Sequence, residues 1–155
     1  WETMYSANGV GLAAPQIGLS IRIFIIDTFA FSEQEELSKR ESSELASFKK
    51  VFINPKIVEQ NGNDWDFNEG CLSIPDIRED VSRKELLKIS FFDENFVFKT
   101  LDLKGIKARV VQHEYDHIEG ILFTDHLSSF KKRILKNKLK NISKGEIKTD
   151  YLMKF

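Results

Sequence analysis

Cysteine, net charge and long hydrophobic runs are all scarce in this sequence of 155 residues. Its single cysteine, Cys71, cannot form an internal disulfide, which suits a reducing compartment. The longest apolar run, Ile23 to Ile26 with its flanks, is far too short to cross a bilayer, and no signal-peptide pattern is present. These absences predict a soluble intracellular protein without a membrane partner.

Charge of one sign is lacking too, because 23 lysines and arginines nearly balance 24 aspartates and glutamates and leave a formal net charge of −1. Bulk electrostatic attraction to DNA, RNA or an anionic membrane is therefore not expected, and such a partner would need a local basic patch. No repeat or low-complexity tract divides the chain, so we expect a single domain over residues 1–155.

The segment Gln112–His117 places two histidines four residues apart, with Glu114 directly after the first. On a helix of about 3.6 residues per turn, His113 and His117 lie one above the other and can ligate one ion. Glu114 is rotated by about 100° from His113, so it is better placed to handle a water on the metal than to be a ligand. This His-Glu-x-x-His pattern is typical of metal-assisted hydrolysis, although a chance match on a solvated helix has the same spacing.

A metal site of this kind needs a third protein ligand. Phe123 occupies the position of the last histidine of a metzincin, which excludes that family. His126 lies beyond Gly120, the expected end of the helix, and is typical of a surface or capping residue. Glu146 could be the downstream carboxylate of a thermolysin-like peptidase, but it lies in a basic tail. Cys71 is the best candidate, because two histidines and a cysteine leave the fourth tetrahedral position open for water.

Apolar and β-branched runs predict a series of strands, of which the first should be buried on both faces. We expect strands at Ile21–Asp27, Val51–Gln60, Asp64–Asn68, Ile77–Val81, Leu86–Phe92 and Asn95–Leu101. Asn61-Gly62 is suited to a tight hairpin turn between the second and third of these strands. Gly9–Gly18 should be a rigid loop with Gln16 at its tip, and Ser32–Lys50 an exposed loop with a fragment of helix at most.

Three- and four-residue spacing predicts a helix from about Lys104 to Gly120, with the imidazoles on its inward edge. A lysine-rich helix should follow from about Ser128 to Asn141, and Lys148–Met153 alternates as a terminal edge strand would. The apolar side of the lysine-rich helix should consist of Phe130, Ile134, Leu135 and Leu139. The expected fold class is α+β, with antiparallel sheets packed around the central metal-binding helix.

Three segments resemble, in this order, the signature segments of the peptide deformylases. They are Gly9–Gln16 (GVGLAAPQ), Glu69–Ser73 (EGCLS) and Gln112–His117 (QHEYDH). The resemblance covers essentially the whole chain, and Trp1–Tyr5 resembles the end of the family's first helix. It implies a single catalytic domain that lacks the family's N-terminal segment. It also implies removal of the formyl group from the N-formylmethionine of newly made bacterial or organellar proteins, with release of formate.

The resemblance further implies that Cys71, His113 and His117 hold one divalent metal ion. Members of the family commonly use Fe(II), and Zn, Ni or Co can substitute for it. The metal would lower the pKa of its water, and Glu114 would act first as general base and then as general acid.

Carried over in the same way, the side-chain amide of Gln16 and the backbone N–H of Leu72 would face the developing oxyanion. Val10, Gly11 and Leu72 would line the substrate groove. Two alternatives stay open: a zinc endopeptidase that uses Glu146 or His126 in place of Cys71, and a degenerate family member or metal-stabilised binding module. A binding module would have no use for a base such as Glu114.

The implied partners are N-formylmethionyl peptides and, through the lysine-rich helix, the ribosome, while DNA and membranes are not expected. The basic residues of this helix are Lys131, Lys132, Arg133, Lys136, Lys138 and Lys140. They could make phosphate contacts with ribosomal RNA, or they could simply be a solvated face. The implied location is the bacterial cytoplasm or an organelle.

Overall fold

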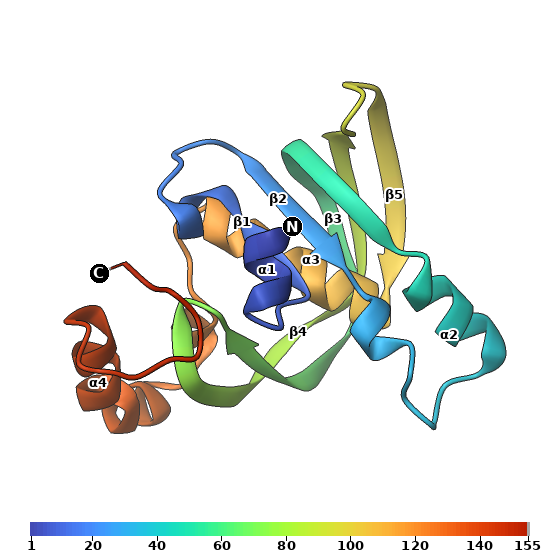
Figure 1. Cartoon of the computed structure of the whole chain (residues 1–155). Coiled ribbons are helices and arrows are strands. Elements are labelled where there is room, and N and C mark those ends of the chain that lie inside the picture. Colours follow the sequence, from blue (N-terminus) through green and yellow to red (C-terminus); the bar gives the residue numbers. More distant parts are fainter. Residues whose placement is uncertain (155) are drawn as a thin grey trace.

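A five-stranded antiparallel sheet frames the protein, and the computed structural model describes residues 1–154 (Figure 1). Each strand pairs with the strand that follows it in the chain, in the order β1-β2-β3-β4-β5. The strands are β1 (Gly11–Ala13), β2 (Ile23–Asp27), β3 (Lys49–Cys71), β4 (Ile74–Phe92) and β5 (Phe98–Lys104). The expected α+β class is confirmed, with one sheet where several were expected.

The helices of the described chain surround this sheet, and α3 packs against β1, β2, β4 and β5. They are α1 (Glu2–Ser6), α2 (Lys39–Ala46), α3 (Gly105–Ile118) and α4 (Ser129–Ser143). α3 is the helix predicted around the two histidines, and Gly120 follows it in the left-handed conformation. α2 is the helix fragment expected within Ser32–Lys50. No helix among residues 1–154 is both long enough and apolar enough to span a membrane.

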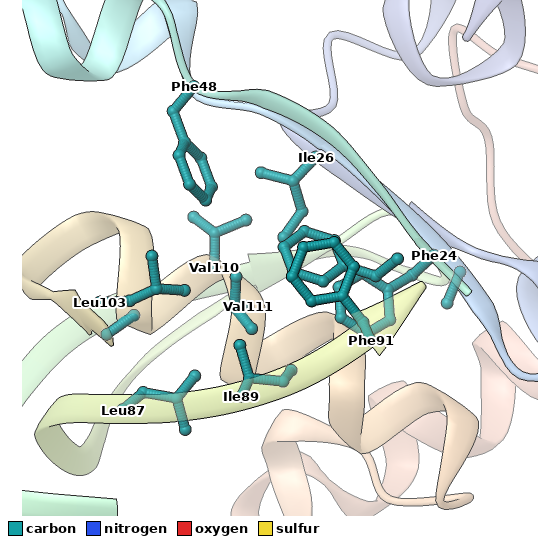
Figure 2. Packing of buried hydrophobic residues seen from close by; sticks show 12 residues of the cluster. Phe24, Ile26, Phe48, Leu87, Ile89, Phe91, Leu103, Val110 and Val111 are labelled. Carbon is teal, nitrogen blue, oxygen red and sulfur yellow. The ribbon is translucent and has the colours of Figure 1, made fainter. Parts of the chain in front are cut away.

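The main core lies where α3 packs on the sheet. Figure 2 shows side chains from β2, β4 and α3 turned toward one another. The rings of Phe24 and Phe52 stack with their centroids 4.7 Å apart, and the ring of Phe91 lies 4.3 Å from that of Phe52. Phe24, Phe52 and Val111 are fully buried. Because burying one such side chain stabilises the fold by about 1.5–3 kcal/mol, this cluster holds α3 in place on the sheet.

A second, smaller cluster holds the beginning of β4 against α4. It consists of Ile74, Ile77, Val81, Phe123, Leu127 and Ile142, and the side chains of Cys71, Leu135, Leu139 and Ile147 pack on it. Ile74 pairs with Cys71 across the turn Leu72–Ser73, which joins β3 to β4. Cys71 therefore lies where β3 enters a tight turn.

The predicted hairpin turn at Asn61-Gly62 is wrong, because β3 runs through this dipeptide without reversing. Asn61 pairs with Leu86 of β4 and Asp64 pairs with Lys84, so β3 carries one extra residue and forms a bulge. Gly62 has a φ of +80°, which a glycine in a bulge adopts as readily as a glycine in a turn. The strands predicted on either side of Asn61-Gly62 are thus one strand, and β4 likewise joins two predicted strands.

The N-terminal loop and the last strand also differ from the predictions. Within Gly9–Gly18, β1 pairs with β2 and is followed by the 3₁₀ helix Ala14–Ile17. β2 alternates between fully and partly buried residues instead of being buried on both faces, because its two faces are covered unequally. β5 begins at Phe98, not at Asn95, since Asp93 and Val97 close a turn through a backbone hydrogen bond of 3.0 Å.

The lysine-rich helix is confirmed as α4, but its expected apolar side is only half right. Leu135 and Leu139 are partly buried, whereas Phe130 and Ile134 are 70% and 64% exposed. The predicted edge strand Lys148–Met153 is wrong, because this segment bends over the surface and does not join the sheet. Helical spacing gives the angle between residues but does not say which side of the helix meets a neighbour.

Substitutions of a phenylalanine in the main core and of a phenylalanine on α4 should have very different effects on stability. We expect Phe52→Ala to lower the free energy of unfolding by about 3–5 kcal/mol, because it leaves a cavity between Phe24 and Phe91. Phe130→Ala should change it by less than about 0.5 kcal/mol, since that ring is exposed. Chemical denaturation followed by circular dichroism measures both. A large loss in the Phe130 variant would show that the apolar side of α4 is buried after all.

Candidate active site

Three side chains of the kinds that bind metals converge where β3 ends and the Leu72–Ser73 turn begins. Cys71 is the last residue of β3, and His113 and His117 lie one turn apart on α3. One ligand atom from each residue lies within 4.8 Å of the others, and the Cys71 Sγ is 3.3 Å from the His117 Nε2. The structure therefore brings together the three residues expected to bind a metal.

The chemistry of this group fits a divalent metal ion. Although burial opposes it, the imidazoles of His113 and His117 lower the pKa of the Cys71 thiol to about 6. The thiolate, the form that binds metals, is thereby favoured near neutral pH. A thiolate and two imidazoles make a donor set that accepts Zn, Fe, Co or Ni, and three protein ligands leave a coordination position for water.

Glu69 orients the first histidine, a role that the Glu69–Ser73 segment did not predict. Its Oε2 lies 2.9 Å from the His113 Nδ1, so a proton held at Nδ1 leaves Nε2 free to face the metal group. Despite burial, His113 and Arg83 keep the pKa of the Glu69 carboxyl well below its usual range. A signal was available, because Glu69 precedes Cys71 by two residues and so lies on the same face of the strand.

Two arginines complete the surroundings of Glu69. The Arg83 Nε donates to Glu69 Oε1 at 2.7 Å, and the Arg109 Nη1 donates to the same oxygen at 2.9 Å. All three side chains are almost completely buried. Each of these hydrogen bonds holds a carboxylate oxygen in a fixed direction. The buried Glu69 carboxylate is therefore held in one orientation.

The alternative third ligands lie elsewhere. The His126 Nε2 is 2.7 Å from Asp116 Oδ2, which also accepts from Arg83, so His126 is engaged in a partly exposed contact with this carboxylate. Glu146 lies 3.8 Å from Lys144 on the exposed chain after α4. Among residues 1–154, the group that could hold a metal contains Cys71 and the two histidines of α3 and neither of these residues.

Glu114 is buried beside the metal group. It is 4% exposed, and its Oε2 has no hydrogen-bond partner among the described residues. Burial raises the pKa of its carboxyl to about 7, against the opposing pull of His113 and His117. β1 passes close to this carboxyl at Gly11, where a Cβ would lie 2.7 Å from the Glu114 Cγ and Cδ. A glycine is therefore needed at this position for Glu114 to occupy its place.

Gln16 and the Leu72–Ser73 turn lie next to Cys71. The Gln16 side chain is fixed by the Ala13 N–H, which donates to its Oε1 at 2.8 Å. Its Nε2 donates to Ser73 Oγ at 3.0 Å and lies 3.6 Å from the Cys71 Sγ. The amide expected near an oxyanion is thus next to the sulfur that would bind the metal.

A cleft of about 530 Å³ opens over these residues, a size suited to a small ligand or a peptide end. All the residues predicted to line a substrate groove line this cleft. Two of the three residues that could hold the metal, Cys71 and His113, line it as well. The site residues that line it are Val10, Gly11, Gln16, Cys71, Leu72, His113 and Glu114.

Comparison with known proteins gives a consistent picture. The chain matches the polypeptide deformylase family model over residues 1–133. It is 59% identical to the peptide deformylase of Flavobacterium johnsoniae and 51% identical to that of Cytophaga hutchinsonii. Both alignments cover 155 residues, 100% of this chain and 79% of the relative.

Solved structures agree with these sequence matches. The peptide deformylase of Ehrlichia chaffeensis superimposes with a TM-score of 0.78 at 34% identity, over 94% of this chain and 78% of that one. The peptide deformylase of Synechococcus elongatus, solved in complex with actinonin, has a TM-score of 0.72 at 36% identity. This second match covers 98% of this chain and 74% of the other.

We expect Cys71→Ser to weaken metal retention by at least about tenfold, because a neutral hydroxyl replaces a soft thiolate and even outer contacts of a metal site contribute this much. His126→Ala is the control and should retain metal as the parent does. Metal content per chain after dialysis against a chelator, measured by mass spectrometry, checks both. Full retention in the Cys71 variant with loss in the His126 variant would make His126 the third ligand.

Proposed function

This chain belongs to the polypeptide deformylase family, and on that premise we propose which of its residues carry out the reaction. The protein is a metal-dependent hydrolase that removes the N-formyl group from the first methionine of newly made proteins. Water cleaves the amide bond between the formyl carbon and the methionine nitrogen, and the products are formate and a free amino group. Membership of this family argues against a general endopeptidase and against a metal-stabilised binding module outside the family.

Cys71, His113 and His117 would hold the metal. When bound, a divalent metal supplies Lewis-acid activation of water near neutral pH. The convergence of the three ligand atoms carries this assignment, and the lowered pKa of Cys71 and the contact between His113 and Glu69 support it. Fe(II) is the metal we propose in the cell, with Zn, Ni or Co able to substitute, because mixed sulfur and nitrogen donors accept all four.

Glu114 would carry the proton. A carboxylate with a pKa near the working pH can accept a proton from the attacking water and return it to the departing amine nitrogen. Its burial, its raised pKa and its unpartnered Oε2 support this role. The same residue would serve as base and then as acid, so the proton need not leave the cleft.

Gln16 and Leu72 would stabilise the oxyanion that forms when water attacks the formyl carbon. The Gln16 Nε2 and the Leu72 backbone N–H are the donors, and one such donor is worth about 3 kcal/mol of barrier. The position of the Gln16 amide beside Cys71 supports the assignment. Val10, Gly11 and Leu72 would bind the methionine end of the substrate, since all three line the cleft.

A substitution of Glu114 tests the proton transfer. Glu114→Ala should retain its metal and lose turnover by about 10²–10⁴-fold, because the metal-binding residues remain while the proton carrier does not. Glu119→Ala, on the exposed end of the same helix region, should behave as the parent. Formate release from a formyl-methionyl peptide and metal analysis are the measurements. Loss of metal in the Glu114 variant would contradict its role as a proton carrier.

We also propose that α4 docks on the ribosome in the bacterial cytoplasm, as the bacterial source of the relatives suggests. The helix lies at the edge of the molecule (Figure 1), and a nearly neutral chain needs a local patch to bind RNA. Lys131 is paired with Glu79, and Lys132 and Lys138 donate to backbone carbonyls. The other three, Arg133, Lys136 and Lys140, are exposed and have neither kind of contact within residues 1–154.

Reversing those three charges to glutamate should reduce co-sedimentation with ribosomes at low salt and flatten its salt dependence, because fewer counterions are released. Formate release from a free formyl-methionyl peptide should stay at the parent rate. The matched control reverses three exposed lysines outside α4, Lys39, Lys56 and Lys104. Equal co-sedimentation of parent and α4 variant would leave α4 as a solvated surface.

A further inference from the structure

The chain after α4 returns to the active-site cleft. This segment lies outside the residues matched by the family model, and Figure 1 shows it leaving α4 and passing back toward the turn between β3 and β4. Ile147 packs on the second core cluster, which anchors the segment. Tyr151 then lines the cleft, and its hydroxyl donates to the backbone carbonyl of Leu72 at 2.8 Å.

This hydrogen bond acts on a peptide unit that also contacts the sulfur. The carbonyl of Leu72 and the N–H of Ser73 belong to one planar peptide unit, so fixing one orients the other. The Ser73 N–H donates to the Cys71 Sγ at 3.4 Å. Tyr151 therefore holds the carbonyl of this peptide unit, and the N–H of the same unit contacts the sulfur of Cys71.

The Leu72–Ser73 turn is held by two side chains from distant parts of the chain. Gln16 donates to the Ser73 hydroxyl at 3.0 Å, and Tyr151 donates to the Leu72 carbonyl. Neither side chain lies on β3 or β4, so these contacts add to the pairing of Cys71 with Ile74 that closes the turn. The Leu72 N–H, one bond away from the fixed peptide unit, depends on the same orientation.

We propose that Tyr151 is a positioning residue for deformylation. It fixes the Leu72–Ser73 peptide, which keeps the Ser73 N–H on the Cys71 sulfur and the Leu72 N–H where an oxyanion donor must lie. Its ring forms part of the cleft wall and contributes to substrate binding separately. The inference rests on the proposed roles of Cys71 and Leu72 and adds a residue that acts through both.

Tyr151→Phe tests the hydroxyl alone, because the ring is retained. Tyr5→Phe is the matched control, since the Tyr5 hydroxyl makes a comparable hydrogen bond, 2.6 Å to Asp27 Oδ2, outside the residues that line the cleft. Both variants and the parent are loaded with Co(II). The measurements are kcat and KM for a formyl-methionyl peptide, and the thiolate-to-cobalt charge-transfer absorption.

We expect Tyr151→Phe to lower kcat by about three- to tenfold, the effect of one hydrogen bond, with KM within about twofold of the parent. The charge-transfer band should move to lower energy, because a thiolate that loses a hydrogen bond gives up its electrons more readily. Tyr151→Ala should also raise KM, since the ring is lost. Tyr5→Phe should match the parent in all three measurements.

An unchanged kcat and an unchanged band in Tyr151→Phe would overturn the inference, even if the variant melts at a lower temperature, because Tyr151 would then only anchor the chain. A fall in kcat of the same size in Tyr5→Phe would overturn it as well. Failure of the parent to release formate would instead contradict the proposed function. In that case the band of Tyr151→Phe, compared with those of the parent and Tyr5→Phe, still decides whether Tyr151 positions the turn.

Discussion

The rest of the site depends on the hydrogen bonds made by the buried carboxylate of Glu69. It extends from β3 and accepts hydrogen bonds from Arg83 on β4 and Arg109 on α3, and it contacts His113 on the same helix. One side chain thus joins the two long strands to the helix. Removing one partner of a buried pair costs about 3–5 kcal/mol, because the remaining charge is left without a partner. The orientation of His113 is therefore tied to the stability of the whole sheet.

The site lies where the two apolar clusters meet, which explains its rigidity. Val110 and Val111 place one side of α3 in the main core, while the His113 ring lies 6.1 Å from the ring of Phe123 in the second cluster. Cys71 packs on that second cluster from the end of β3. The helix and the turn are thus positioned by separate sets of contacts. The position of the site therefore depends on both clusters.

The close approach of β1 to α3 has an electrostatic consequence. Because Gly11 has no side chain, the β1 backbone covers the Glu114 carboxyl and separates it from solvent. Burial of this kind favours the neutral form of an acid and raises its pKa toward the range in which it can both accept and donate a proton. The packing of a three-residue strand therefore contributes directly to the chemistry proposed for Glu114.

What the sequence by itself determined was local. The four-residue spacing of His113 and His117 requires only helical periodicity, and it predicted α3 and its metal-binding face correctly. Spacing alone left His126 and Glu146 open as the third ligand, whereas donor chemistry favoured Cys71 and the resemblance of three ordered segments supported the same choice. At Asn61-Gly62 the sequence correctly indicated a positive φ, which Gly62 adopts. The predicted turn was wrong because a bulge in a long strand satisfies the same preference.

Only the tertiary structure decided which distant side chains meet. Four features depend on how the strands pair and how the helices pack: the buried side of α4, the contact of His126 with Asp116, the contact of Glu69 with His113 and the return of Tyr151 to Leu72. Periodicity along the chain carries no information about these contacts, because it describes neighbours within a few residues. Contacts between distant residues depend on burial and hydrogen bonding summed over the whole fold.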